Sequence, residues 1–193
     1  ILMWLSALQE SQSIDDARTL SKFIGLNRRP TIQDIRQYVV DLKELGYCEI
    51  EERLNCIRLH FADRPAPSHY NKYLDWCQVA EMKGSGITFG SHAVSHRILD
   101  RLDDSECLSE LVVSREALEH ELCEPVHSFA YPNGDNNARV RDLVKSCGYS
   151  VAFATDQGFY SSGCDQFRIP RINVHENSTF SEAMFMCTIL NIF

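Results

Sequence analysis

The first third of the chain has apolar side chains at helical spacing. Residues 14–24 form one amphipathic stripe, and Gly25 follows it as a natural helix end. A second stripe covers residues 32–42, after Thr31, which is typical of an N-cap with an acidic residue three positions further on. This pattern predicts a mainly helical region over residues 1–61.

Residues 49–61 fit either a helix or a strand. Their apolar positions match a helical stripe, while the alternation over 57–61 also suits a strand. The strand option would give two helices followed by a β-wing, as in a winged-helix DNA-binding segment in residues 1–61. Charge argues against this alternative, because residues 1–64 contain nine Lys or Arg and ten Asp or Glu, without a basic recognition face.

From residue 73 onward, short apolar strands alternate with amphipathic helices. A short helix ends at Gly84, an apolar strand follows over 86–90, and a capping box of Asp103 and Glu106 opens a long helix. That helix is expected to turn its apolar stripe to the core: Leu108, Leu111, Val112, Leu118 and Leu122. Further strands are expected over 126–130, 149–154 and 167–175, and further helices over 140–147 and 181–193. The alternation predicts parallel βα units and an α/β fold.

The proline-containing segment over residues 63–68 is the clearest linker in the chain. It suggests a helical leading region or insertion over residues 1–64 and a second domain over residues 65–193.

Composition narrows the class of partner. The net charge of −8 argues against nucleic acid, and no apolar run is long enough to span a membrane. The eight cysteines include no Cys-x-x-Cys pair, so we expect reduced cysteines that pack as small hydrophobic residues. The chain begins with Ile1 rather than Met, which is expected for the middle of a longer gene product.

Residues 90–96, Gly-Ser-His-Ala-Val-Ser-His, hold two histidines four positions apart. If this segment winds through a helical turn, His92 and His96 point the same way. Neutral imidazole is a common ligand of divalent metals, and functional groups of α/β folds gather beyond the carboxyl ends of strands. Because such a pair also arises by chance, the spacing alone is a weak indication of a metal site.

The whole block resembles the second motif of the polysaccharide deacetylases, the NodB-homology or carbohydrate esterase family 4 enzymes. The family form is His-Ser/Thr-x-x-His, and this chain has Ala93 where Ser or Thr is usual. Phe-Ala-Tyr-Pro-Asn-Gly, residues 129–134, is similar to the third motif. Gly-Tyr-x-x-Ala, Thr-x-x-Gly and Pro-Arg-Ile, within residues 148–172, resemble the family's tail. The resemblance covers residues 73–175.

The resemblance implies a partial, distorted (β/α) barrel of the NodB-homology type, α/β in class, with a helical N-terminal insertion. It implies a metal-dependent hydrolase that removes N-acetyl or O-acetyl groups from an acetylated polysaccharide or oligosaccharide. His92 and His96 would bind a divalent metal, zinc in most members. Tyr131, Pro132 and Asn133 would form one wall of the groove, with a backbone amide on the tyrosine side for the developing oxyanion.

A proton donor is also implied by the family's Leu-x-His motif near the end of the domain. His175, in Val-His-Glu at the end of an expected strand, is the candidate in this chain. Asp156 and Arg171 are candidates for orienting it. An exposed histidine without a catalytic role is the alternative interpretation of His175.

The family's first motif, Thr-Phe-Asp-Asp-Gly, supplies a carboxylate ligand and the general base, and it does not occur in these 193 residues. Asp15-Asp16 lies in a polar helix start and Asp103-Asp104 at a helix cap, so neither replaces it. We therefore expect an N-terminally truncated member that is inactive by itself. A non-catalytic carbohydrate-binding relative is the alternative.

Overall fold

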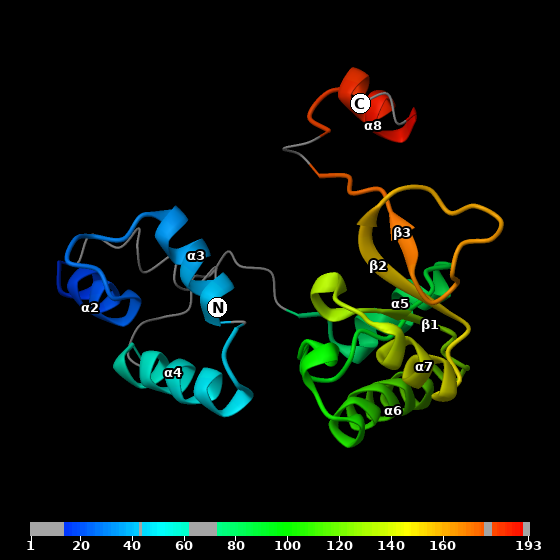
Figure 1. Cartoon of the computed structure of the whole chain (residues 1–193), viewed down its shortest axis with the longest axis horizontal. Helices are drawn as coiled ribbons and strands as arrows, with labels where there is room; N and C mark the ends of the chain where they lie inside the picture. Colours follow the sequence, from blue (N-terminus) through cyan, green and yellow to red (C-terminus); the bar gives the residue numbers. More distant parts are fainter. Residues whose placement is uncertain (1–13, 43, 62–72, 176–178, 191–193) are drawn as a thin grey trace. The chain divides into compact units, whose positions relative to one another are not determined.

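The computed structural model of the chain describes residues 14–42, 44–61, 73–175 and 179–190. The chain divides into two compact units, unit 1 (Ile1–Tyr73) and unit 2 (Leu74–Phe193), as Figure 1 shows. The linker predicted over 63–68 lies outside the described residues. The domain limits derived from it therefore stay predictions.

The described residues of unit 1 form three helices, α2 (Ile14–Ile24), α3 (Ile32–Leu42) and α4 (Tyr47–His60). Gly25 ends α2 with a φ of 79°. Thr31 and Asp34 exchange the two hydrogen bonds of a capping box at the start of α3. The helices bury one apolar core, formed by Leu20, Ile35, Tyr38, Leu42, Leu54, Ile57 and Phe61. Both helices predicted from the apolar stripes are confirmed.

Of the ambiguous residues 49–61, all but Phe61 belong to helix α4, and Phe61 is its C-cap. Ile57 and Phe61 are buried, whereas Leu59 between them is 79% exposed. A strand would have put all three side chains on one face, so the helical period explains this burial and the strand does not. Since residues 14–42 and 44–61 contain no strand, they do not form the β-wing that the winged-helix alternative required.

Unit 2 contains a parallel sheet of three strands in the order β1 (Ser128–Ala130), β2 (Val151–Gln157) and β3 (Ile169–Arg171). Phe129 pairs with Ala152, and Phe153 pairs with Ile169. The predicted α/β class with parallel pairing is confirmed. Closure into a barrel stays a prediction, because the strands in the described part of the chain form an open sheet.

Three helices share one core with this sheet: α5 (Trp76–Gly84), α6 (Asp104–Leu122) and α7 (Ala138–Ser146). Helix α6 contacts both α5 and α7. The predicted capping box of Asp103 and Glu106 opens α6, and Gly148 follows α7 with a φ of 85°. Two short 3-10 turns, η1 (Leu99–Arg101) and η2 (Pro132–Gly134), complete the connections.

The buried face of α6 differs from the predicted apolar stripe. Leu111 and Leu122 are buried as expected, but Val112 is 37% exposed. Three residues that the stripe omitted are buried in its place: Cys107, Glu110 and Ser114. The prediction was wrong here because it counted only apolar residues, while the inward face of this helix includes polar ones.

The strand expected over residues 86–90 is reduced to a single bridge at Ser91, which pairs with Phe129. Gly90 explains how the backbones approach so closely: a Cβ atom there would lie 2.4 Å from the hydroxyl oxygen of Ser128. The segment therefore meets β1 only at its carboxyl end. That end is where the two histidines follow.

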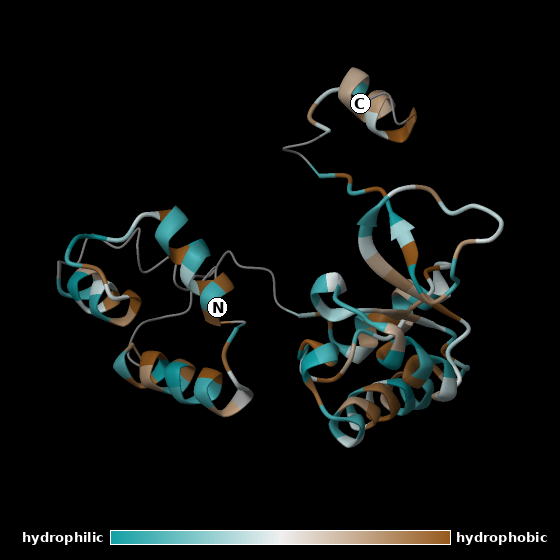
Figure 2. Ribbon diagram, in the orientation of Figure 1, coloured by the Kyte–Doolittle hydropathy of each residue, from teal (hydrophilic) through white to brown (hydrophobic). Residues whose placement is uncertain are grey.

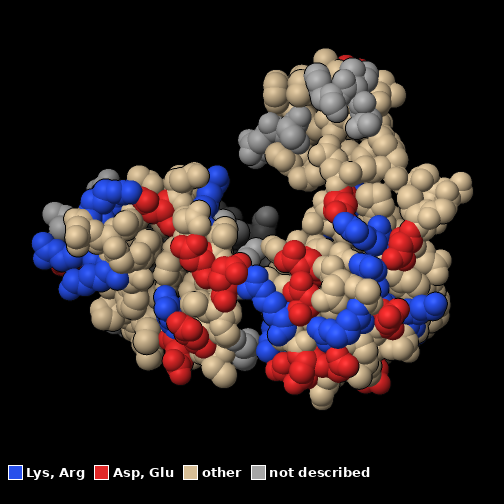
Figure 3. All heavy atoms as spheres, viewed as in Figure 1, with Lys and Arg blue, Asp and Glu red and all other residues tan. Residues whose placement is uncertain are grey.

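Helix α8 (Glu182–Leu190) confirms the predicted last helix within the described residues. Its residues are mostly hydrophobic (Figure 2), yet none of them is buried. Among the described helices, none is both long and apolar enough to cross a membrane. On the face drawn in Figure 3, basic and acidic side chains are mixed over both units.

Candidate active site

The histidine loop, residues 91–98, begins beside the last residues of β1. The Ser91 amide donates to the Ser128 carbonyl, and the Ala130 amide donates to the Ser91 carbonyl, both at 2.9 Å. These two bonds anchor the loop at the carboxyl end of the sheet. Functional side chains of α/β folds gather at this end.

The two imidazole rings of the loop lie together. The ring centroids of His92 and His96 are 4.8 Å apart, with an angle of 81° between the ring planes. Their predicted proximity is confirmed, but the helical turn considered for it is wrong. The loop contains no α-helical residue, and Ala93 and His96 have left-handed φ angles of 65° and 60°.

One hydrogen bond defines the tautomer of His92. Its Nδ1 atom lies 2.7 Å from the carbonyl oxygen of Ala130. Because a carbonyl oxygen only accepts, Nδ1 must hold the proton, and Nε2 of the neutral ring keeps its lone pair. A metal-binding histidine commonly donates its second N–H to a backbone carbonyl in this way. The pair therefore fits the nitrogen part of a zinc donor set.

A carboxylate ligand is missing from the described surroundings of the pair. Over residues 14–42, 44–61, 73–175 and 179–190, no group of three or more His, Cys, Asp or Glu side chains could hold a metal ion. Asp15 and Asp16 lie in the first turn of α2, in unit 1. Asp103 accepts a hydrogen bond from the Glu106 amide as the cap of α6. The Asp103 carboxylate therefore serves as a helix cap and not as a metal ligand.

In the turn after β1, which is expected to form one wall of the groove, two of the three candidate residues are buried. Tyr131 is 1% exposed, and its hydroxyl donates to the Phe167 carbonyl at 2.8 Å. Burial raises the pKa of this phenol. Its backbone amide donates to the Phe153 carbonyl at 3.1 Å, so this amide is engaged in the sheet and not turned to an oxyanion. Pro132 is also buried.

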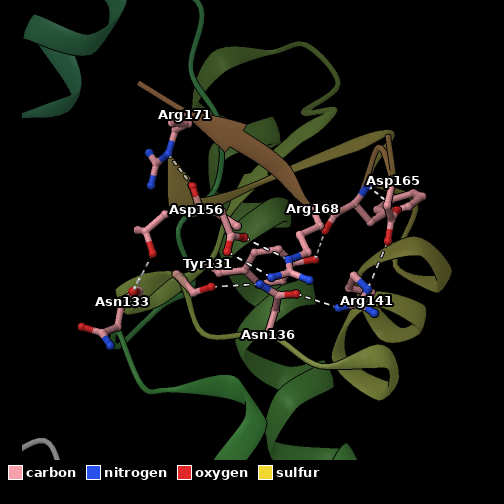
Figure 4. Close-up of polar contacts among 12 residues, drawn as sticks. Tyr131, Asn133, Asn136, Arg141, Asp156, Asp165, Arg168 and Arg171 are labelled. Atoms are coloured by element: carbon pink, nitrogen blue, oxygen red, sulfur yellow. Dashed lines mark hydrogen bonds and ion pairs between the residues drawn. The ribbon is translucent and has the colours of Figure 1, made fainter. Parts of the chain in front are cut away.

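Asn133 is the exposed residue of the three predicted to contact substrate. It has a left-handed φ of 59°, and its side-chain amide donates to the Asp135 carboxylate at 2.7 Å. Its carbonyl accepts a hydrogen bond from the Thr155 hydroxyl at the end of β2 (Figure 4). The turn therefore presents Asn133 to solvent, while Tyr131 and Pro132 hold it to the core.

The candidate orienting residues lie at the ends of β2 and β3 (Figure 4). Asp156 accepts two hydrogen bonds from Arg168, at 2.9 and 3.0 Å, and this guanidinium lowers the pKa of the carboxyl. Arg171 donates from Nε to the Ala154 carbonyl at 2.7 Å. Asp156 is thus paired with Arg168, a residue that the sequence analysis did not single out.

His175 lies four residues beyond β3, with an exposed side chain. Its carbonyl accepts hydrogen bonds from the amide and the hydroxyl of Thr179, both at 2.8 Å. Its role as a proton donor stays a prediction.

Sequence reasoning missed two residues that support the histidine loop, Glu110 and Ser114 of α6. The Glu110 carboxylate accepts hydrogen bonds from the amides of Val94 and Ser95, and the Ser114 hydroxyl bonds that of Ser91 at 2.7 Å. The signal in the sequence that could have revealed these two residues is their position on the helix. Both share the inward face of α6 with Cys107 and Leu111, where a polar residue calls for a partner.

Comparison with known proteins identifies the family to which this histidine loop belongs. The model of the polysaccharide deacetylase family matches residues 56–152, half of the chain. The chain belongs to the polysaccharide deacetylase family. The family resemblance found in its motifs is thereby confirmed.

Individual polysaccharide deacetylases show the same relation. The chain is 25% identical to YxkH of Bacillus subtilis over 97 residues, 50% of this chain and 35% of that protein. The Streptococcus pyogenes deacetylase PplD, solved in complex with acetate, matches with 26% identity and a TM-score of 0.57, over 63% of this chain and 52% of PplD. BA0330 of Bacillus anthracis matches with 28% identity and a TM-score of 0.56, over 62% of this chain and 37% of BA0330.

The polysaccharide deacetylase match covers only part of the candidate site. It includes the histidine loop and the Tyr131 turn, and it ends before Asp156, Arg171 and His175. The chain spans about a third of the length of YxkH and about half of PplD. The family assignment therefore bears on the histidine pair more directly than on the strand-end residues.

Proposed function

We propose that this chain forms part of a metal-dependent deacetylase that hydrolyses N-acetyl or O-acetyl groups of a polysaccharide. The observation that supports this function is the histidine pair. Its rings are 4.8 Å apart, and the Ala130 carbonyl orients one of them within the segment that matches the family.

His92 and His96 would hold the metal, which is zinc in this proposal. When bound, such a metal lowers the pKa of a water molecule and polarises the acetyl carbonyl. The Ala130 carbonyl holds the Nδ1 proton of His92, which keeps Nε2 unprotonated. Asn133, exposed in the turn after β1, would contact the sugar, while Tyr131 and Pro132 would fix the turn from the core.

Proton transfer to the leaving group would fall to His175. Its exposed position after β3 allows a proton donor role toward an amine or alkoxide. Asp156 and Arg171 would orient His175 from the ends of β2 and β3. Arg168 holds the Asp156 carboxylate by hydrogen bonds, and Arg171 donates to the Ala154 carbonyl.

A carboxylate ligand and a general base complete such a site. We infer that they come from a part of the relatives' length that this chain does not span, since the described residues place no carboxylate as a third ligand. This inference makes the 193-residue chain a weak zinc binder without deacetylase activity.

Acetate release tests the proposal. Zinc content and acetate release from an N-acetylated chito-oligosaccharide would be measured for the 193-residue chain and for a chain extended upstream. We expect the extended chain to gain zinc binding and acetate release together, and His92→Ala to remove both. Tight zinc binding and turnover by residues 1–193 alone would contradict the inferred upstream carboxylate. Turnover that survives complete removal of metal would contradict the metal-dependent mechanism.

A second candidate is a carbohydrate-binding relative without catalysis. The missing third ligand among the described residues favours it. An extended chain that binds the oligosaccharide but releases no acetate would support this candidate over the enzyme.

A further inference from the structure

Glu110 is a buried carboxylate that binds the middle of the histidine loop. The residue is 8% exposed and lies in the middle of α6. Its Oε2 atom accepts hydrogen bonds from the amides of Val94, at 2.8 Å, and Ser95, at 2.9 Å. Its Oε1 atom accepts the hydroxyl of Ser95. Burying a carboxylate is costly unless its oxygens accept such bonds. The three donors of the loop therefore compensate for the burial of Glu110.

The bound segment lies between the two histidines. Val94 and Ser95 are the residues that directly precede His96, and Ala93 follows His92. The segment is neither helix nor strand, so regular backbone pairing does not satisfy the amides of Val94 and Ser95. Ala93 and His96 also have left-handed φ angles, of 65° and 60°, which are unfavourable for residues with a Cβ atom. The loop therefore needs contacts from outside itself to keep this shape.

Helix α6 supplies these contacts along one face. Ser114, one turn after Glu110, bonds the hydroxyl of Ser91 at the start of the loop, at 2.7 Å. Glu106, one turn before Glu110, pairs with Arg97 near the loop's end, at 3.0 Å. Residues four positions apart lie on the same helix face, so the loop follows α6 in the antiparallel direction. Glu110 makes the central one of these three polar contacts between α6 and the loop.

Glu110 acts on the rings through the backbone. Both of its oxygens are used by donors of the loop, and these donors belong to Val94 and Ser95 and not to either histidine. Partners that orient the ligands of a metal affect its affinity without touching the ion.

We propose that Glu110 is a positioning residue that holds His92 and His96 together for a shared metal ion. The proposal rests on the metal-dependent function above. Loss of the carboxylate would leave two backbone amides without their acceptor and release the segment between the histidines. The rings would then separate, and the site would lose the preorganisation that binds a metal through both of them.

The test uses the 193-residue chain and four variants. Glu110→Ala removes the acceptor, and Glu110→Asp shortens it and decides the test if the alanine variant does not fold. Glu110→Gln keeps an oxygen for the two amides and is the conservative rescue. Glu116→Ala is the matched control, because Glu116 is an exposed glutamate on the same helix.

Two readouts separate the positioning of the rings from metal binding. The first, without metal, is the nuclear Overhauser effect between the ring protons of His92 and His96. The second is the zinc dissociation constant, from titration of the same ring resonances. We expect Glu110→Ala and Glu110→Asp to lose the ring-to-ring effect and to weaken zinc binding about 10- to 100-fold. Glu110→Gln and Glu116→Ala should retain both.

The outcomes are distinguishable. A ring-to-ring effect that persists in folded Glu110→Ala or Glu110→Asp overturns the positioning role. Its loss in Glu116→Ala also overturns it, because the effect would then follow general damage to α6. If the ring effect changes as expected while the unaltered 193-residue chain binds no zinc, the positioning of the rings stands, and zinc binding is then measured on the chain extended upstream. If that extended chain also binds no zinc, the proposed metal-dependent function fails while the positioning role remains.

Discussion

At the scale of single residues, neighbours in one motif have different tasks. Tyr131 and Pro132 are buried, and Asn133 beside them is exposed. Likewise, His92 is oriented by the Ala130 carbonyl, whereas Ser95 in the same loop is held by Glu110. A motif therefore combines groups that face substrate with groups that fix the backbone.

His175 provides a test at this scale. In the active, extended chain, His175→Ala should lower turnover about 10²- to 10⁴-fold, because it removes a proton donor to the leaving group. Zinc content should stay unchanged, since His175 is not proposed as a ligand. The measurements are acetate release and metal analysis, with His120→Ala as the control, because the His120 side chain is 85% exposed on α6. An unchanged rate would support the alternative interpretation, in which His175 is an exposed histidine without a catalytic role.

The cysteines provide a second residue-scale test. All eight are free thiols in the structure, and burial raises the pKa of Cys107 to about 11. The thiolate is the reactive form, so Cys107 should remain unlabelled by a thiol reagent at pH 8 while exposed Cys77 and Cys123 react. Labelling with and without denaturant, mapped by mass spectrometry, measures this. Equal rates for Cys107 and Cys123 would show that α6 opens readily.

At the scale of elements, α6 connects most of unit 2. It supports the histidine loop through Glu110, and Arg115 donates to Glu119 at 2.8 Å and to the Cys147 carbonyl after α7. Glu119 in turn accepts the Val126 amide just before β1, at 2.9 Å. The helix is thus joined by polar contacts to the loop, to α7 and to the segment that leads into the sheet.

The lowered pKa of Glu119 predicts that the unfolding free energy falls in acid. The hydrogen bond from the Val126 amide, with Arg115 beside it, lowers the pKa of Glu119 below its ordinary value of 4.5. A carboxyl with a lowered folded-state pKa stabilises the fold above 4.5, and this contribution is lost as pH falls through the folded-state value. Glu119→Gln should therefore flatten the dependence of the unfolding free energy on pH below 4.5, measured by denaturant titration. Glu116→Gln, exposed on the same helix, is the control for the loss of one carboxylate from α6.

The turn after β1 predicts a strict need for glycine. Gly134 has a φ of 87°, and a Cβ atom there would lie 1.9 Å from the hydroxyl oxygen and 2.7 Å from the Cβ of Thr155. Gly163 has a φ of 102° with open space around it and serves as the control. Gly163→Ala should cost about 1–2 kcal/mol of unfolding free energy from its backbone conformation. Gly134→Ala should cost about 1–3 kcal/mol more from the clash. Equal losses, measured by denaturant unfolding, would contradict the close approach of Gly134 to Thr155.

At the scale of the whole molecule, the described residues form an apolar core within each of the two units. One contains Leu20 and Ile35 among the helices of unit 1, and the other contains Leu111 and Phe129 between the sheet and helices of unit 2. Each core is a cluster of its own. The two units are therefore expected to unfold as separate cooperative transitions.

Ile35→Ala tests this independence. The side chain is fully buried in unit 1, and its loss should cost about 2–5 kcal/mol in the stability of that unit. The amide and ring resonances of the histidine loop should keep their positions and their own melting transition. Leu111→Ala, buried in unit 2, is the reciprocal variant and should lower the second transition alone. One shared transition, shifted by both variants, would show that the units are coupled.

Local signals in the sequence predicted most elements correctly. The helical stripes gave α2 and α3, the Asp103–Glu106 box gave the start of α6, and the glycines at 25 and 148 gave helix ends. Helix periodicity, caps and left-handed glycines act within a few residues, so they can be recognised without the rest of the fold. The motif around the two histidines identified the family for the same reason, because its residues are contiguous.

Contacts between distant residues were decided only by the tertiary structure. The sequence determined that His92 and His96 are four positions apart, and the fold brought their rings together without a helix, through a loop held by Glu110. It likewise placed the Tyr131 phenol in the core and paired Asp156 with Arg168. Hydrogen bonds such as these join residues 12 to 38 positions apart, and they form only when the elements pack together. No regular spacing in the sequence marks which distant residues will meet, so these contacts could not be predicted from it.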